Sequence, residues 1–422
     1  MHRVEKEKLS IKKLLLLIFA VFLITAGFAL PEWRSVEAAL SDYSPKSPPS
    51  LSPPSKGSSY NDPVFGTKII RITDASDASI ATIAYPHWPA FNSNSTKLII
   101  GLDDNPYLYS FDPNNYTFQK LAPLFNGDPM QWEGMTWSTT DPDTVYGISG
   151  YNSNIKLRAY NVTTKQYTFV HDFTAAGELP AGIPHQMSKA RANDRFFSFD
   201  WRPGDGQPVR YAIVYDKQLN KTYKFDVQAS YGVPGYDECR LDRDGNYLYM
   251  NNGNFELWVW KFASQSPEQR TFVAKNAAYK PGGHSDSGAG FYINADVWGG
   301  GNNNGNRIIK RSLDNPTSWG EMFDSGASGD WQSDHHISLI GPNDTWALVT
   351  TMAASPNYSL PFTNEIFLVK TDGSGQVKRL LHHRSSNADY WNTPRANLSP
   401  DGRFAAYASD MGGGHVDTYV AV

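Results

Sequence analysis

The chain has 422 residues, of which 14% are aromatic and only 19% are charged. Its formal net charge of −4 supplies no overall positive field, which excludes nucleic acid as the expected partner. The single cysteine, Cys239, excludes an internal disulfide, and we interpret its thiol as a small buried hydrophobe. The high aromatic content favours β-structure, because flat and stiff side chains suit a pleated surface.

Residues 1–38 have the pattern of an export signal. Basic residues between positions 3 and 13 precede an apolar run over residues 14–30, which is the order typical of a secretory signal peptide. Val36 and Ala38 suit a cleavage site before Ala39. That site lies well past the apolar run, so an uncleaved membrane anchor is the alternative. We expect a secreted or cell-surface protein with a bacterial-type export signal.

Residues 39–60 are rich in proline and serine, with five prolines between positions 45 and 54. Such a composition cannot bury a core and favours extended, solvated conformations. We therefore predict a disordered linker here that makes no packed contacts with the folded domain, which we assign to residues 61–422.

Short alternating apolar runs follow residue 60, separated by clusters of Gly, Asn, Asp and Pro, and this is a strand-and-turn pattern. The clearest unit spans residues 392–407, where a polar opening leads to a strand, a Pro-Asp-Gly turn and a second strand. Similar units begin near positions 87, 132, 185, 236, 284, 335 and 393. A period of about 50 residues in an all-β chain predicts propeller blades.

The sequence thus predicts an all-β, seven-bladed β-propeller with four strands in each blade. The run at residues 68–72 precedes the first unit and can pair with the last strand, at residues 418–422, to close the ring. Two β-sandwich domains are the structural alternative, but they would not explain seven similar units.

Polar residues recur where the first strand of each unit begins. In a propeller that strand lines the central channel, and ligand sites favour such concave mouths. Five of the ten histidines fall at these openings. The candidate catalytic residues are His185, Tyr236, His284, His335 and Arg395. The candidate substrate-binding residues are Trp132, Glu133, Asp237, Arg240, Tyr390 and Trp391. The alternative is that turn-like openings merely tolerate polar side chains.

Two chemistries fit such a ring of residues. One is a site for a divalent metal ion, manganese or calcium, with His284, Gln332, His335 and His336 as candidate ligands. Adjacent histidines on a strand point to opposite faces, however, so His335 and His336 share a channel site only if the backbone is irregular. The other chemistry is proton abstraction, with a His or Tyr as the base and an Arg that neutralises a carboxylate.

The last unit carries Ser399-Pro400-Asp401-Gly402, then Ala408-Ser409-Asp410 and Tyr419-Val420. In these motifs the chain resembles the seven-bladed propellers related to oligogalacturonate lyases. The resemblance implies β-elimination on a uronate glycan and a manganese ion held by histidines and a glutamine. The family's last-blade ligands would fall at Tyr390, Thr393 and Arg395, so that ligand set is absent. Arg395 and Tyr390 instead suit a site similar to that of the ulvan-lyase propellers, which needs no catalytic metal.

We therefore expect a secreted, lyase-like propeller that acts on an acidic polysaccharide or oligosaccharide. The alternative is a non-catalytic surface propeller that binds glycan or protein through the same rim. We expect a monomer, with membrane attachment only if the N-terminal segment stays uncleaved.

Overall fold

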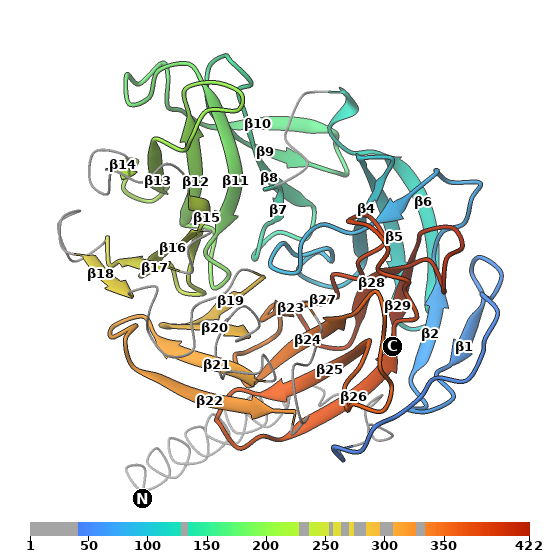
Figure 1. Cartoon of the computed structure of the whole chain (residues 1–422). Coiled ribbons are helices and arrows are strands. Elements are labelled where there is room, and N and C mark those ends of the chain that lie inside the picture. The colour runs from blue at the N-terminus through green and yellow to red at the C-terminus, as the bar shows by residue number, and fades with distance from the viewer. Residues whose placement is uncertain are drawn as a thin grey trace, which may run out of the picture. The chain divides into compact units, whose positions relative to one another are not determined.

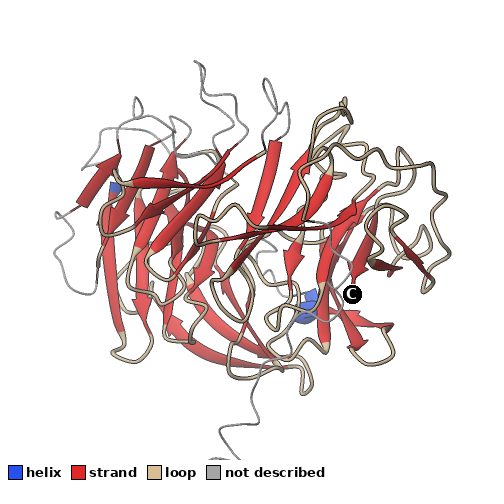
Figure 2. Ribbon diagram, turned by 90° about the horizontal axis from the view of Figure 1, so that it is seen from below, coloured by secondary structure: helices blue, strands red, loops and turns tan. Residues whose placement is uncertain are grey.

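The strand-and-turn pattern folds into seven antiparallel sheets around a central axis, as the computed structural model of the protein shows (Figure 1). The structure describes residues 41–127, 134–227, 236–252, 256–262, 270–273, 284–295, 307–325 and 334–422. Seen from below in Figure 2, the described parts of the chain are almost entirely strands and connecting loops. No helix within these ranges is long and apolar enough to cross a membrane. The predicted signal or anchor, residues 1–38, lies outside them and stays a prediction.

The first three blades each contain four strands. The first blade consists of β3 (Ala81–Thr82), β4 (Lys97–Leu102), β5 (Asn105–Asp112) and β6 (Thr117–Pro123), followed by the 3-10 turn η2 (Leu124–Gly127). The second consists of β7 (Thr136–Trp137), β8 (Thr144–Ser149), β9 (Lys156–Asn161) and β10 (Gln166–Asp172). The third consists of β11 (Ile183–Lys189), β12 (Phe196–Arg202), β13 (Tyr211–Asp216) and β14 (Lys221–Asp226).

The next three blades repeat this arrangement. The fourth consists of β15 (Tyr236–Leu241), β16 (Leu248–Asn252), β17 (Glu256–Trp260) and β18 (Arg270–Val273). The fifth consists of β19 (Asp286–Gly288), β20 (Phe291–Ala295), β21 (Arg307–Ser312) and β22 (Trp319–Asp324). The sixth consists of β23 (Asp334–Ser338), β24 (Trp346–Met352), β25 (Glu365–Lys370) and β26 (Val377–His382).

The seventh blade joins the two ends of the propeller, which confirms the predicted closure. Its strands run in the order β1 (Ser59–Asn61), β2 (Lys68–Arg71), β29 (Asp417–Ala421), β28 (Ala405–Ser409) and β27 (Asn397–Leu398). Ile70 of β2 pairs with Val420 of β29. The sheet has five strands rather than the predicted four, because β1 adds an outer strand at the end of the Pro/Ser-rich segment.

The hydrophobic core lies between neighbouring sheets. Ile70 and Val420 of the closing blade pack with Leu98 and Ile100 of the first blade. Cys239 is fully buried in a similar layer between the third and fourth blades, as predicted. This face-to-face packing accounts for the apolar residues of the repeats and leaves the inner strands free to carry polar side chains at their ends.

The first blade departs from the repeat at its inner strand. Thr82 pairs with Gly101, and Phe91 forms a bridge with Leu98. Between these two pairs the chain of the inner strand covers nine positions, whereas β4 covers only three. Residues 83–90 leave the ladder, and we call them the crossing segment.

Hydrogen bonds tie the crossing segment to the inner strands of three other blades. The indole of Trp88 donates to the carbonyl of Met187 at 2.8 Å, in the third blade. The hydroxyl of Ser338, in the sixth, donates to the carbonyl of Pro86 at 2.8 Å. The amide of Asn397, in the seventh, donates to Pro86 and to Trp88. The crossing segment thus packs among the inner strands of other blades and does not pair as part of the inner strand of its own blade.

Residues 42–54 contact the sixth and seventh blades, so the prediction of a contact-free linker is wrong for this stretch. Tyr43 donates to the carbonyl of Gly375 at 2.5 Å, and its ring centroid lies 5.1 Å from that of Phe362. Arg71 and Arg384 donate to the carbonyls of Pro54 and Pro49. An extended, proline-rich backbone has no internal hydrogen bonds, so its carbonyls are free to accept from side chains. We call residues 42–54 the strap.

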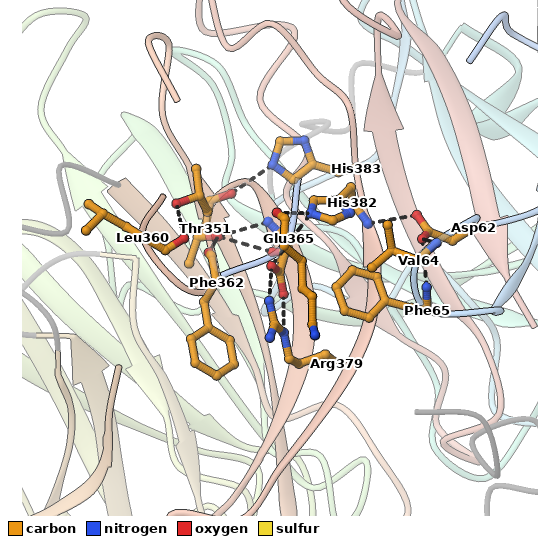
Figure 3. Close-up of polar contacts among 12 residues, drawn as sticks. Asp62, Val64, Phe65, Thr351, Leu360, Phe362, Glu365, Arg379, His382 and His383 are labelled. Carbon is orange, nitrogen blue, oxygen red and sulfur yellow. Dashed lines mark hydrogen bonds and ion pairs between the residues drawn. The ribbon is translucent and has the colours of Figure 1, made fainter. Parts of the chain in front are cut away.

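The strap also completes a buried ion pair. Arg379 and Glu365 are both fully buried, and their side chains form two parallel hydrogen bonds of 2.8 and 2.5 Å (Figure 3). The remaining Nη1 of Arg379 donates to the carbonyl of Ser44 at 2.6 Å. His382 donates to the carbonyl of Lys46 at 3.1 Å. The strap therefore supplies acceptors that a buried guanidinium needs.

Candidate functional site at the rim of the channel

Backbone strain marks the openings of three inner strands. Gln186, His284 and Arg395 have φ values of 48°, 55° and 43°. Left-handed backbone is uncommon for such residues and tends to gather at functional sites. β11 also has a register shift between His185 and Ser188. These irregularities let side chains near the openings point away from the ordinary two-residue alternation of a strand.

Tyr85, on the crossing segment, is the centre of a cluster of aromatic and basic side chains. Its ring centroid lies 5.5 Å from that of His336, 6.1 Å from that of His284 and 6.3 Å from that of Tyr390. His87 lies 5.9 Å from the same ring. The guanidinium carbon of Arg395 lies 4.9 Å from it. We call these six residues the rim cluster: Tyr85, His87, His284, His336, Tyr390 and Arg395.

Arg395 is held in place by both stacking and hydrogen bonds. Its guanidinium carbon lies 3.9 Å from the centroid of the Tyr390 ring, which is close for a cation–π contact. Nε donates to the hydroxyl of Thr393 at 2.9 Å, and Nη2 donates to the carbonyl of Tyr390 at 2.5 Å. Within the described ranges, Nη1 has no hydrogen-bond partner. The orientation of the guanidinium is therefore fixed, and its Nη1 is the donor that these contacts do not use.

Two histidines of the rim cluster, His336 and His87, are kept neutral. Burial, followed by the charges of neighbouring His284 and Arg395, holds the pKa of His336 well below its usual range. Burial and the guanidiniums of Arg240 and Arg191 act in the same direction on the pKa of His87. The ring centroids of His284 and His336 are 4.2 Å apart. Two adjacent imidazoles beside a guanidinium cannot readily all carry positive charge.

The structure brings three of the predicted residues together, namely His284, Tyr390 and Arg395. It also places His336, a predicted metal ligand, among them. His185 lies instead beside Arg202, with 3.5 Å between Nδ1 and Nη2. His335 is buried and precedes His336 on β23, so the two side chains point to opposite faces of the sheet.

The other predicted residues are placed as follows. Arg240 is buried and donates to the carbonyl and hydroxyl of Ser285, which links the fourth blade to the fifth. The Trp391 ring lies 5.1 Å from that of Tyr390, edge to face. Only the backbone of Tyr236 and Asp237 is described, as part of β15. Trp132, Glu133 and Gln332 lie outside the described residues.

Sequence reasoning did not single out Tyr85. It sits in the run Tyr85-Pro86-His87-Trp88-Pro89, where two prolines lack the N–H that a ladder needs. Those prolines were the available signal that the inner strand of the first blade is interrupted here.

A recess lies at the opposite end of the inner strands. It has a volume of about 260 Å³ and is lined by residues from the turns that follow these strands, among them Arg191, Arg243 and Pro400. Along each inner strand, rim residues precede recess residues, as His336 precedes Ile340 and Arg395 precedes Pro400. The recess is therefore separate from the rim cluster.

Comparisons with known proteins identify solved structures that have a similar fold. No protein-family model and no curated protein sequence matches the chain. An oligogalacturonate lyase solved in complex with manganese is similar in structure, with a TM-score of 0.62 and 12% identity over 86% of this chain and 95% of that one. An oligogalacturonate lyase from Vibrio parahaemolyticus has a TM-score of 0.58 and 12% identity over 86% of this chain and 96% of that one.

A manganese ion is thus a group that the fold relatives imply, and the residues present do not fit it. No group of three or more His, Cys, Asp or Glu side chains suited to a metal ion occurs among the described residues. The two adjacent imidazoles, His284 and His336, have the guanidinium of Arg395 as a neighbour rather than a carboxylate. A dication would be repelled there, so we derive no step through a metal. The propeller resembles the oligogalacturonate lyases in fold.

Proposed function

We propose that the protein is an exported lyase that cleaves an acidic, uronate-containing glycan by β-elimination at the rim cluster. The observation that carries this proposal is the combination, in one cluster, of a fixed guanidinium and imidazoles, of which burial keeps His336 and His87 neutral. β-Elimination next to a carboxylate needs both, because the carboxylate must be neutralised before the adjacent C–H becomes acidic enough to lose its proton.

Arg395 is the group that would hold the uronate carboxylate. Its Nε and Nη2 are committed to Thr393 and Tyr390, while Nη1 has no partner in the described part of the chain. A donor that is already oriented costs little entropy when the substrate binds. Stabilising the doubly charged enolate that forms on proton loss is the largest contribution expected from this residue.

His284 is the group that would take the proton. It is partly exposed, unlike the neighbouring His336, which is buried, and it belongs to the same cluster as Arg395. In the reaction, the C5 proton passes to the imidazole, the C4–O bond breaks and a C4=C5 double bond forms. The leaving oxygen takes a proton from water or from the phenol of Tyr390. No water is added across the broken bond.

Aromatic side chains at the rim suit a sugar ring. Tyr390 is 47% exposed, which is unusual for a side chain that also packs on an arginine. Trp391 beside it is partly exposed. Aromatic faces stack on the C–H faces of sugars, and here they would position the uronate against Arg395. The fold likeness to oligogalacturonate lyases supports the proposal at the level of the scaffold.

The experiment is a screen of the purified protein against oligogalacturonate, alginate, ulvan, hyaluronan and heparan sulfate. Ultraviolet absorbance reports the double bond conjugated with the carboxylate. We expect absorbance to rise with at least one of these glycans. No rise in absorbance with any of these glycans would contradict the proposal that the protein is a lyase.

One observation favours a second function, a non-catalytic binder of glycan or protein. Arg395 and His336 are each only 3% exposed, so a substrate can reach little of either side chain. A binder would hold a glycan at the rim through the exposed ring of Tyr390, lose affinity on replacement of Tyr390, and release no unsaturated product.

A further inference from the structure

The recess lies at the end of the inner strands opposite the rim cluster. It has features of a ligand site that the proposed lyase reaction does not require. Its volume of about 260 Å³ is far more than one water molecule needs and falls near the lower end of small-molecule pockets. Turns from six blades contribute to it, from Pro89 in the first blade to Pro400 in the seventh. A single small molecule would therefore contact most of the ring.

The charged side chains that line the recess are all cationic. Lys189, Arg191 and Arg243 belong to the lining, and none of the lining residues that the structure describes is acidic. Each cation has a carboxylate partner at 2.9 Å, but these partners, Asp194, Asp286 and Asp344, do not belong to the lining. The cationic ends of three ion pairs thus face the recess, which favours an anionic group there.

Arg191 has a donor that the protein leaves unused. Its Nη1 donates to both oxygens of Asp286, and its Nη2 donates to the carbonyl of Ser287. Its Nε is buried and, among the described residues, has no hydrogen-bond partner. An unmet buried donor is costly, and a ligand oxygen would satisfy it.

The rest of the lining divides into two kinds of surface. Hydroxyl-bearing residues, including Ser138 and Thr139, come from the second blade, beside the cations. Apolar residues, including Pro89, Ile340 and Pro342, come from the first and sixth blades. A ligand that has a charged end, hydroxyl groups and an apolar face matches this arrangement.

The crossing segment separates the recess from the rim cluster. Tyr85 and His87 belong to the rim, whereas Pro89 lines the recess. Between them, the carbonyls of Pro86 and Trp88 are bound by Ser338 and Asn397. The two ends of the channel are therefore distinct places for ligands.

We propose that the recess is a second binding site, which takes one small hydroxylated carboxylate of the size of a single sugar acid. Arg191 and Arg243 bind the carboxylate, the remaining lone pair of the Thr139 hydroxyl accepts from a hydroxyl group, and the proline-rich side packs against the C–H face. This site does not depend on the proposed lyase reaction.

The test is a thermal-shift titration of the full chain with sodium glucuronate, sodium phosphate and glucose at constant ionic strength. We expect glucuronate to raise the melting temperature in a saturable way, and glucose to have no effect. Arg243→Met should weaken glucuronate binding about tenfold or more, as expected for the loss of a charge-assisted hydrogen bond. Arg191→Lys, which keeps the charge but removes Nε, should also weaken binding and serves if the first variant does not fold.

Two control variants test whether glucuronate binds in the recess. Arg403 pairs with Asp401 on the turn of the seventh blade but does not line the recess, so Arg403→Met should bind glucuronate normally. Arg210→Met should also retain the shift, because Arg210 pairs with Asp226 at the outer strand β14 and does not line the recess. A shift that both Arg243→Met and Arg191→Lys leave unchanged would overturn the proposal, because glucuronate would then bind outside the recess. A shift with phosphate or glucose but none with glucuronate would also overturn it.

Discussion

The guanidinium carbon of Arg395 lies 3.9 Å from the centroid of the Tyr390 ring, and the same guanidinium donates to the carbonyl of Tyr390. Stacking and hydrogen bonding thus fix a planar cation just before the inner strand β27 of the seventh blade. The left-handed backbone of Arg395 is part of this arrangement. A fixed, planar donor is suited to a carboxylate in a way that a flexible ammonium is not.

Arg395→Lys tests this geometry. The variant keeps the positive charge but loses the planar fork and the stack on Tyr390. We expect both weaker substrate binding and slower turnover, because the carboxylate and the enolate derived from it depend on the same contact. Steady-state kinetics on the glycan found by screening measures KM and kcat separately. Kinetics equal to the wild type would show that Arg395 has a structural role only.

His284→Gln tests the base. An amide of similar shape cannot accept the proton, so we expect turnover to fall about a hundredfold or more while the melting temperature changes little. His171→Gln is the matched control, since His171 bonds Glu178 at the outer strand β10 and touches no rim residue named above. Equal losses in the two variants would argue against a role for His284 in proton transfer.

The strap should stabilise the propeller. Arg379 is fully buried, and cutting the strap frees residues whose carbonyls accept from it. An engineered protease site at Pro48-Pro49 should therefore lower the melting temperature on cleavage, with a cost of about 1–3 kcal/mol for each buried donor left unsatisfied. The same site placed in the exposed loop at Gly204–Gly206 should have little effect on cleavage. An unchanged melting temperature after strap cleavage would show that these contacts contribute nothing.

Buried histidines should make stability fall in mild acid. Burial lowers the pKa of His382 to about 3 and the pKa of His383 to about 3. Between those values and about 6.5 the unfolded chain binds more protons, so the free energy of unfolding drops as pH falls, by about 1.4 kcal/mol per pH unit for each histidine. Burial raises the pKa of Glu365 to about 7, which has the opposite effect on stability between about pH 4.5 and 7.

Two histidines outweigh one glutamate in this window, and the neutral His336 and His87 add to them. We therefore expect the melting temperature to decrease from pH 6.5 to pH 5, measured by calorimetry. His383→Gln should reduce the slope of this decrease. A melting temperature that rises as the pH is lowered from 6.5 to 5 would mean that these histidine side chains are solvated.

Metal removal should leave the lyase reaction unchanged. The rim cluster has a guanidinium beside the adjacent imidazoles of His284 and His336, and the described residues offer no three-ligand set. Dialysis against a chelator, followed by the absorbance assay with and without manganese, measures this directly. Loss of activity that manganese restores would show that a metal site exists after all.

The sequence was sufficient for the architecture because blade repeats have a period and turn residues that local chemistry dictates. It also predicted that His284, Tyr390 and Arg395 lie near the openings of inner strands, where the structure brings their side chains together, and their roles stay predictions. It was not sufficient for Tyr85, because the crossing segment breaks the register, and its place depends on hydrogen bonds to distant blades such as those of Ser338 and Asn397.

The strap was missed for a related reason. Proline-rich composition predicts that a segment cannot form a core of its own, which holds for residues 42–54. It does not reveal that a buried arginine elsewhere, Arg379, lacks acceptors that this segment can supply. Composition describes a segment alone, whereas its order here depends on partners more than 300 positions away in the chain.

The central claim is that the rim cluster breaks a glycosidic bond by elimination. The most direct measurement is mass spectrometry of the products formed from a uronate oligosaccharide in ¹⁸O-labelled water. The account predicts a new non-reducing end that has lost the elements of water and carries no label from the solvent. Products whose masses include one added, labelled water would demonstrate hydrolysis and contradict the account.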